Sequence, residues 1–194
     1  MLATPSAKAA KEKAIWMGRL LAFLPLALGL GGCIDSGADL SASLPPAFPI
    51  ADGFYKAAND PKSPAFKVVR VGSEYRTIDP NAPDGGGAVF TLMDPDHSGV
   101  FIAEDKTSAK DLKPPRYLYY FVRVDPARNR VDLYDFTQAD WRRLPADLKK
   151  GLKPGASVSV VEDADAAMIL RAIERRVAAH PTLRQTTFLL VRKL

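Results

Sequence analysis

From residue 53 onward, apolar and polar residues alternate in short runs that end at turn residues. Runs of this kind, rich in aromatic and β-branched residues, are typical of half-buried β-strands. The pattern predicts strands at residues 53–57, 65–72, 73–79, 87–94, 99–105, 116–125, 129–136, 156–161 and 186–193. Hairpin turns are expected at Gly72-Ser73, within 94–99 and over 126–129, because glycine, proline and asparagine favour turn geometry.

The run 116–124 is apolar on both of its alternating faces. Tyr117, Tyr119 and Phe121 share one face, and Leu118, Tyr120, Val122 and Val124 share the other. A strand that is apolar on both faces is usually covered on both sides. We therefore predict a central strand here.

After Phe136 the apolar period becomes helical, with predicted helices over residues 138–150 and 163–180. The second helix has a clear apolar stripe, formed by Ala166, Ile169, Leu170, Ile173 and Val177. Arg171, Glu174 and Arg175 are predicted to face water.

These elements predict a mainly β (α+β) fold with late helices. Consecutive hairpins favour an antiparallel meander. The strand count suits either an open sheet covered by the helix at 163–180 or a small lipocalin-like barrel. The pattern leaves this choice open.

The N-terminal region has a different pattern. A basic leader precedes residues 20–32, which contain no charged residue. This run is too short for a membrane-spanning helix, which needs about 20 apolar residues. A basic segment, a short apolar segment and small residues, in that order, are typical of a secretory signal peptide. Pro25 and the glycines argue against the alternative of a buried helix.

Leu30-Gly31-Gly32-Cys33 ends the apolar run and contains the only cysteine of the chain. This segment resembles the lipobox of bacterial lipoprotein precursors. The resemblance implies that Cys33 receives a diacylglyceryl thioether, that the chain is cut before it, and that the new amino group is acylated. Two or more acyl chains anchor a protein stably to a bilayer. The alternatives for Cys33 are a small buried hydrophobic residue or a free thiol.

The resemblance divides the chain into a signal peptide at 1–32, the acylated cysteine and a tether at 33–50, and one periplasmic β-rich domain at 51–194. It implies an exported protein on the inner or outer membrane. Met17 is an alternative start of translation, because residues 17–33 alone form a compact signal sequence.

The 27 basic and 22 acidic residues give the chain a net charge of +5. Four of the basic residues and one acidic residue lie before Cys33, so 23 basic and 21 acidic residues follow it, a net charge of +2. This balance predicts no general attraction to nucleic acid.

One stretch resembles a calcium-binding loop. Asp94, Asp96 and Ser98 occupy alternate positions, Gly99 is sixth and Asp105 is twelfth, as in the EF-hand spacing. The EF-hand motif has glutamate at its twelfth position and helices on both sides, whereas the flanks here are predicted strands. The alternative is an ordinary hairpin turn.

No catalytic arrangement is visible in the sequence. The only histidines are His97 and His180, and no paired histidines or further cysteines could form a zinc site. No nucleophile-elbow or phosphate-loop motif occurs. We therefore predict no cofactor and no enzyme activity. A periplasmic hydrolase without a recognisable motif is the alternative.

The aromatic strand is the candidate for ligand binding. Tyr117, Tyr119, Phe121 and Arg123 share one face and could line a cavity for a small hydrophobic ligand. If that face is internal, the charge of Arg123 needs a partner or an anionic ligand. The alternative is that the aromatic residues belong to the core. The sequence thus predicts an envelope lipoprotein with a binding or assembly role, whose partner is an envelope protein or such a ligand.

Overall fold

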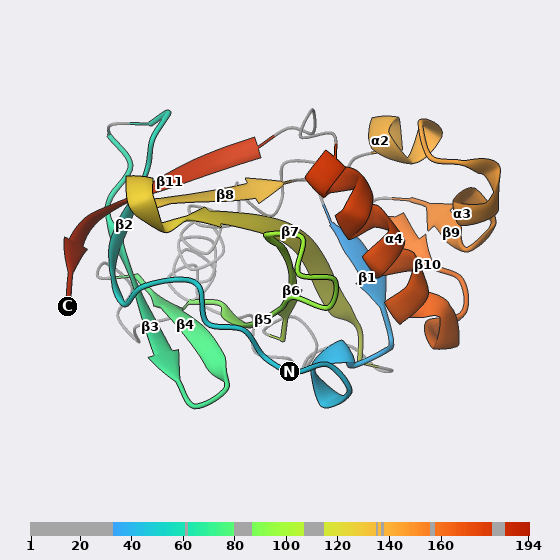
Figure 1. Ribbon diagram of the computed structural model, residues 1–194, viewed down its shortest axis with the longest axis horizontal. Helices are drawn as coiled ribbons and strands as arrows, with labels where there is room; N and C mark the ends of the chain where they lie inside the picture. Colours follow the sequence, from blue (N-terminus) through green and yellow to red (C-terminus); the bar gives the residue numbers. More distant parts are fainter. Residues whose placement is uncertain are drawn as a thin grey trace, which may run out of the picture.

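The computed structural model describes residues 33–60, 62–79, 87–106, 115–134, 136, 138–155, 158–179 and 185–194. Within them, eight antiparallel strands close into a barrel, and α4 (Ala166–Ala179) lies on its outer wall (Figure 1). The prediction of a mainly β fold with late helices is confirmed, and the structure selects the barrel over the open sheet. The predicted signal peptide at 1–32, with Met17, and His180 lie outside the described residues.

The barrel strands follow one another around the wall as a meander. They are β2 (Gly53–Ala57), β3 (Phe66–Val71), β4 (Glu74–Ile78), β5 (Val89–Met93), β6 (Val100–Asp105), β7 (Tyr117–Asp125), β8 (Arg130–Tyr134) and β11 (Gln185–Lys193). The last strand closes the barrel, because β11 pairs with β8 on one side and β2 on the other. Gly72 and Asn129 have positive φ in the predicted turns before β4 and β8.

Three shorter strands extend the sheet beyond β7. They are β1 (Ile34–Ser36), β9 (Leu152–Pro154) and β10 (Val158–Val160). β1 pairs antiparallel with the first part of β7 and parallel with β10, while β8 pairs with the second part of β7. The sequence pattern predicted β10 within the run 156–161 but did not predict β1 or β9.

The remaining elements are short. They are the 3-10 helices η1 (Leu40–Ala42), η3 (Pro126–Arg128) and η4 (Asp163–Asp165), and the α-helices α2 (Gln138–Arg142) and α3 (Ala146–Lys150). α2 and α3 lie within the predicted helical region 138–150, and η4 leads directly into α4.

Large side chains fill the barrel interior. Its buried core consists of Ile50, Tyr55, Val68, Tyr75, Leu92, Ala103, Val122, Val131 and Phe188. The rings of Phe66 and Phe188 meet edge to face with centroids 5.4 Å apart, and those of Tyr75 and Phe90 stack at 5.5 Å. An interior filled in this way is expected for eight strands, whose barrel is just wide enough for side chains.

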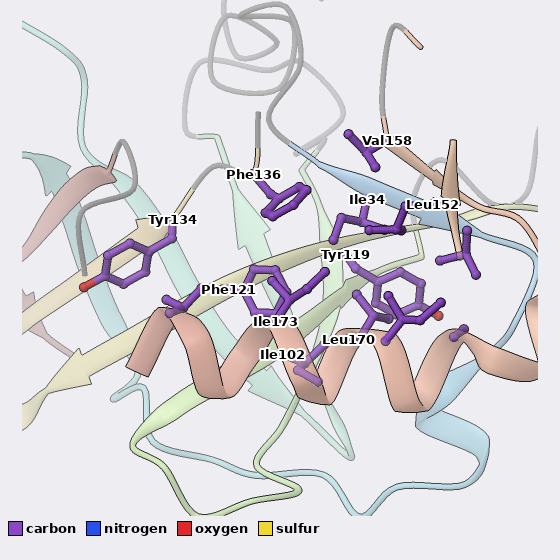
Figure 2. Packing of buried hydrophobic residues seen from close by; sticks show 14 of the residues in the cluster. Ile34, Ile102, Tyr119, Phe121, Tyr134, Phe136, Leu152, Val158, Leu170 and Ile173 are labelled. Carbon is purple, nitrogen blue, oxygen red and sulfur yellow. The ribbon is translucent and has the colours of Figure 1, made fainter. Parts of the chain in front are cut away.

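A second core lies between the outer wall and α4. Figure 2 shows Tyr119 and Phe121 of β7 and Ile34 of β1 gathered with Leu170 and Ile173 of the helix. β7 therefore has a core on each face, as its two apolar faces predicted.

The predicted stripe of α4 is buried, but one residue beside it departs from the prediction. Glu174 is 0% exposed, so the expectation that it faces water was wrong. It follows Ile173 and lies one turn before Val177, at the edge of the stripe. The turn between β5 and β6 covers this edge and provides a hydrogen bond to Glu174.

Residues 33–50 are packed against the barrel, whereas the sequence predicted a tether. β1 and η1 fall within this segment, Pro46 forms a bridge with Met93, and Leu40 and Ile50 are buried. The small, polar and proline-rich composition suggested a flexible segment. Its few apolar residues nevertheless reach the two cores, and its backbone pairs with the sheet.

Candidate functional site

Cys33 lies directly before β1 and is partly exposed. Its carbonyl oxygen accepts a hydrogen bond from the amide of Val158, with an N–O distance of 3.2 Å. The predicted lipid attachment point therefore joins the folded domain without an intervening linker.

The predicted ligand-binding residues lie on the outer wall of the barrel. Tyr119 and Phe121 are 0% exposed in the core beneath α4, and Tyr117 packs at its border. The opposite face of β7, with Val122, points into the barrel. The aromatic residues thus pack the helix onto the sheet and do not line the barrel interior.

Arg123 has protein partners on this outer face. Its Nη2 donates a hydrogen bond of 3.4 Å to the carbonyl oxygen of Ala178, and its guanidinium lies 5.9 Å from the centre of the Tyr134 ring. A cation suits the carbonyl groups at the end of α4. The positive charge of Arg123 therefore has its partner in the carbonyl groups at the C-terminal end of α4.

The residues with calcium-loop spacing separate in the structure. Asp94, Asp96 and Ser98 lie in the turn between β5 and β6, whereas Asp105 lies at the other end of β6. Asp96 forms ion pairs with Arg171 and Arg175 of α4. Across the described ranges, no group of three histidine, cysteine or acidic residues could hold a metal ion. The turn joins the β5–β6 hairpin to α4.

A buried carboxylate that the sequence analysis did not identify lies on β6. Glu104 is 0% exposed, and its Oε2 accepts hydrogen bonds from the amides of Leu40 (2.7 Å) and Ser41 (3.2 Å). The Tyr119 hydroxyl donates to the same oxygen at 2.9 Å and also lies within hydrogen-bond distance of the Ala38 carbonyl oxygen. Glu104 therefore holds the chain after β1 against the barrel wall.

Other polar contacts fix the same segment. Arg116 donates to Asp35 Oδ1, and Ser159 donates to Asp35 Oδ2 at 2.9 Å. The Ser36 hydroxyl donates to Asp163 at 2.7 Å. These contacts join residues that are far apart in sequence, and we call them, with the Glu104 contacts, the N-terminal clamp.

A small polar hollow of about 200 Å³ opens beside Glu104. Asp39, Ser41, Thr91 and Lys106 are among the residues that line it. Within the described part of the chain, Thr91 Oγ1 and Glu104 Oε1 are buried without a hydrogen-bond partner, and Lys106 Nζ lies 3.9 Å from Glu104 Oε1. The hollow can therefore hold water or another small polar molecule.

The surroundings shift the acid strengths of these groups in different directions. Burial raises the pKa of the Glu104 carboxyl, although the hydrogen bonds from Ser41 and Tyr119 oppose this shift. Burial also tends to raise the pKa of Asp39. The hydrogen bond from Ser41 and the charge of Lys106 outweigh this effect, and the pKa of Asp39 is therefore lowered. Glu104 can thus hold a proton at a pH where Asp39 is ionised.

The sequence contained a signal for Glu104. It alternates with Val100 and Ile102 and therefore shares their buried face of β6. A charged residue on an apolar face needs buried hydrogen-bond donors. Those donors come from the segment that the composition suggested was a tether, so the sequence could not identify them.

None of the helices in the described ranges is long and apolar enough to cross a membrane. Neither a protein-family model, nor a curated protein, nor a solved structure matches the chain.

Proposed function

We propose that this chain is the precursor of a bacterial envelope lipoprotein. In this proposal Cys33 carries the lipid anchor, and the barrel domain is a non-catalytic binding or assembly accessory in the periplasm. The lipobox-like segment Leu30-Gly31-Gly32-Cys33, at the end of an uncharged run, is the observation that carries it.

A cut before Cys33 is compatible with the described part of the fold. β1 begins at Ile34, so cleavage there would leave every described strand and helix intact. The N-terminal clamp joins the following residues to the barrel. An anchor on Cys33 would therefore hold the domain directly at the membrane surface, without the reach of a flexible tether.

The packing of the barrel supports binding through its outer surface. Interior residues such as Tyr75 and Leu92 are at most 1% exposed and pack against one another. A partner that contacts the outer wall would leave this core undisturbed. We therefore favour a protein partner over a hydrophobic ligand inside the barrel.

The anchor is tested by the intact mass of the full chain after expression in a Gram-negative host and gentle membrane extraction. The expected species starts at Cys33 and carries a diacylglyceryl group and an amide-linked acyl chain. Cys33→Ser should give no acylated species and should leave the membrane fraction. A protein that retains residues 1–32 and has no added mass would contradict the proposal.

The binding role is tested by native mass spectrometry of the same extract. We expect a complex with a discrete protein. A small hydrophobic molecule bound to the monomer, with no protein partner, would instead favour a ligand-binding role.

A further inference from the structure

The side of the barrel away from α4 has a distinct charge pattern. The three neighbouring strands β3, β2 and β11 contain no aspartate or glutamate. Figure 1 shows β2 and β3 at the opposite end of the molecule from β1, β10 and α4. The charged residues of the three strands are all basic: Lys56, Lys67, Arg70, Arg192 and Lys193.

Strand alternation identifies which side chains form the outer surface. Tyr55, Val68 and Phe188 belong to the interior core, so the residues next to them point outward. A register shift between Leu190 and Arg192 follows on β11. The surface, which we call the basic face, consists of Phe54, Lys56, Lys67, Val69, Leu189, Val191 and Arg192.

The pairing of the strands mixes apolar and basic groups on this face. Lys56 lies opposite Leu189, and Phe54 lies between Lys67 and Arg192. The Arg192 guanidinium lies 4.2 Å from the centre of the Phe54 ring. Aromatic residues and arginine are enriched in protein interfaces, where they provide both contact area and charge.

Two apolar residues of the basic face are exposed, whereas Phe54 and Val69 are partly buried. Leu189 is 40% exposed and Val191 is 56% exposed, whereas the corresponding wall beneath α4 is buried. Apolar groups that remain exposed among basic side chains are typical of an interaction surface. Because these strands are paired on both sides within a closed sheet, a partner would contact this surface through side chains.

The charge and the position of the face select its partner. A second copy would bring like charges together, which opposes self-association through this face. In the eight-strand ring, β2 and β3 lie three and four strands from β7, the neighbour of β1, and β11 lies two strands from it. A bilayer that holds Cys33 would therefore lie nearest β1 and β7, away from β2 and β3. This step depends on the proposed anchor.

We infer that the basic face docks an acidic surface of a partner protein. The basic side chains provide charge complementarity, which speeds association and selects the partner. Phe54, Leu189 and Val191 provide the apolar contact. The inference adds the partner's chemistry and the docking surface to the proposed accessory role, on which it rests.

Site-specific photo-cross-linking of the full chain in its membrane tests this inference. The photoreactive residue benzoylphenylalanine replaces Leu189 on the basic face or, in the control, Met168, which is 60% exposed on α4. Position 189 should give one discrete protein adduct, and position 168 should not give that adduct. The adduct should weaken with rising salt concentration, because exposed charges are screened.

Charge variants identify the chemistry of the contact. Lys56→Glu with Lys67→Glu should reduce the adduct at least about tenfold, since it places like charges against the partner. Lys56→Gln with Lys67→Gln, which removes the two charges without reversing them, should reduce the adduct less. This second variant guards against a folding defect in the charge-reversed chain. The matched control, Lys150→Glu with Lys153→Glu, changes exposed residues of α3 and β9 and should leave the adduct unchanged.

Four results would overturn the inference: adducts with lipid, adducts with a second copy of the chain, a protein adduct that charge reversal does not reduce, or no adduct. The mass of the chain in the same sample tests the anchor on Cys33 separately. A salt-sensitive adduct on an unacylated chain would support the docking surface and contradict the proposed anchor.

Discussion

Two buried glutamates lie where different segments meet the outer wall of the barrel. Glu104 of β6 accepts three hydrogen bonds, two of them from the N-terminal segment. Glu174 of α4 accepts one, from the Ser98 hydroxyl at 2.6 Å, and its Oε2 has no hydrogen-bond partner in the described ranges. Both carboxyls are 0% exposed, but their surroundings differ.

The difference follows from what else holds each segment. α4 has a buried apolar stripe and the ion pairs of Asp96, so its packing does not depend on Glu174. The N-terminal segment has fewer apolar contacts, so polar groups contribute a larger share of its attachment. Buried polar groups thus have different energetic roles even on one wall of one barrel.

The largest effect is expected from Glu104→Ala. This substitution leaves the amides of Leu40 and Ser41 without their acceptor, whereas the Tyr119 hydroxyl can still donate to the Ala38 carbonyl oxygen. The free energy of unfolding should fall by about 2 kcal/mol or more, because each buried donor without a partner costs about 1–3 kcal/mol. Urea unfolding measures the loss. Glu162→Ala, at an exposed site, should change stability by about 0.5 kcal/mol at most. Equal losses in the two variants would contradict the role of the clamp.

A smaller loss is expected from Tyr119→Phe. The ring remains in the core beneath α4, but the contacts of its hydroxyl with Ala38 and Glu104 disappear. We expect a loss of about 1 kcal/mol, as for a typical intramolecular hydrogen bond. The double variant with Glu104→Ala tests whether the two residues act together. Strict additivity of the two losses would show that they are independent.

The stability of the protein should depend on pH in a defined direction. Burial raises the pKa of both Glu104 and Glu174 above 4.5, so the native state binds their protons more tightly than the unfolded state. The resulting stabilisation is complete below pH 4.5 and is lost as the pH rises through the higher native values. Urea midpoints at increasing pH above 4.5 should therefore decrease.

Carboxyls with lowered pKa values act in the opposite direction at lower pH. The pKa of Asp96 is lowered chiefly by its hydrogen bond from Arg171, and that of Asp163 by its hydrogen bond from Ser36. Their stabilisation is present above pH 3.8 and is lost as the pH falls through the native values. A urea midpoint that rises steadily from acidic to alkaline pH would contradict the opposite contributions of these two groups of carboxyls.

The smallest effect on stability at neutral pH is expected from Glu174→Gln. The amide can still accept the Ser98 hydrogen bond, and it removes the repulsion of the glutamate charge by Asp94 and Asp96. Stability should change by less than about 1 kcal/mol, and the decrease with rising pH should become shallower. The stability loss is compared with that of Glu104→Gln. A larger loss for Glu174→Gln than for Glu104→Gln would reverse the assignment of roles.

Local pattern predicted most of the elements but not the partners of the polar residues. The alternation in 66–71 and 74–78 identified a hairpin, and Gly72 identified its turn. The two apolar faces of β7 predicted a covered strand, but not which face would meet α4. The prediction for Glu174 was wrong because helical spacing places it at the border of the stripe, where the β5–β6 turn contacts it.

The amino-acid pattern is enough to predict the class of elements, their order and the central position of β7, because these depend on the period of apolar residues and on local turn geometry. It also contains the lipobox-like segment, which is a local motif. Tertiary contacts alone set the closure of the barrel, the burial of Glu104 and the position of β2 and β3 away from β1. These depend on pairings between distant parts of the chain, such as β2 with β11 and β1 with β10, and such pairings leave no periodic signal in either strand alone.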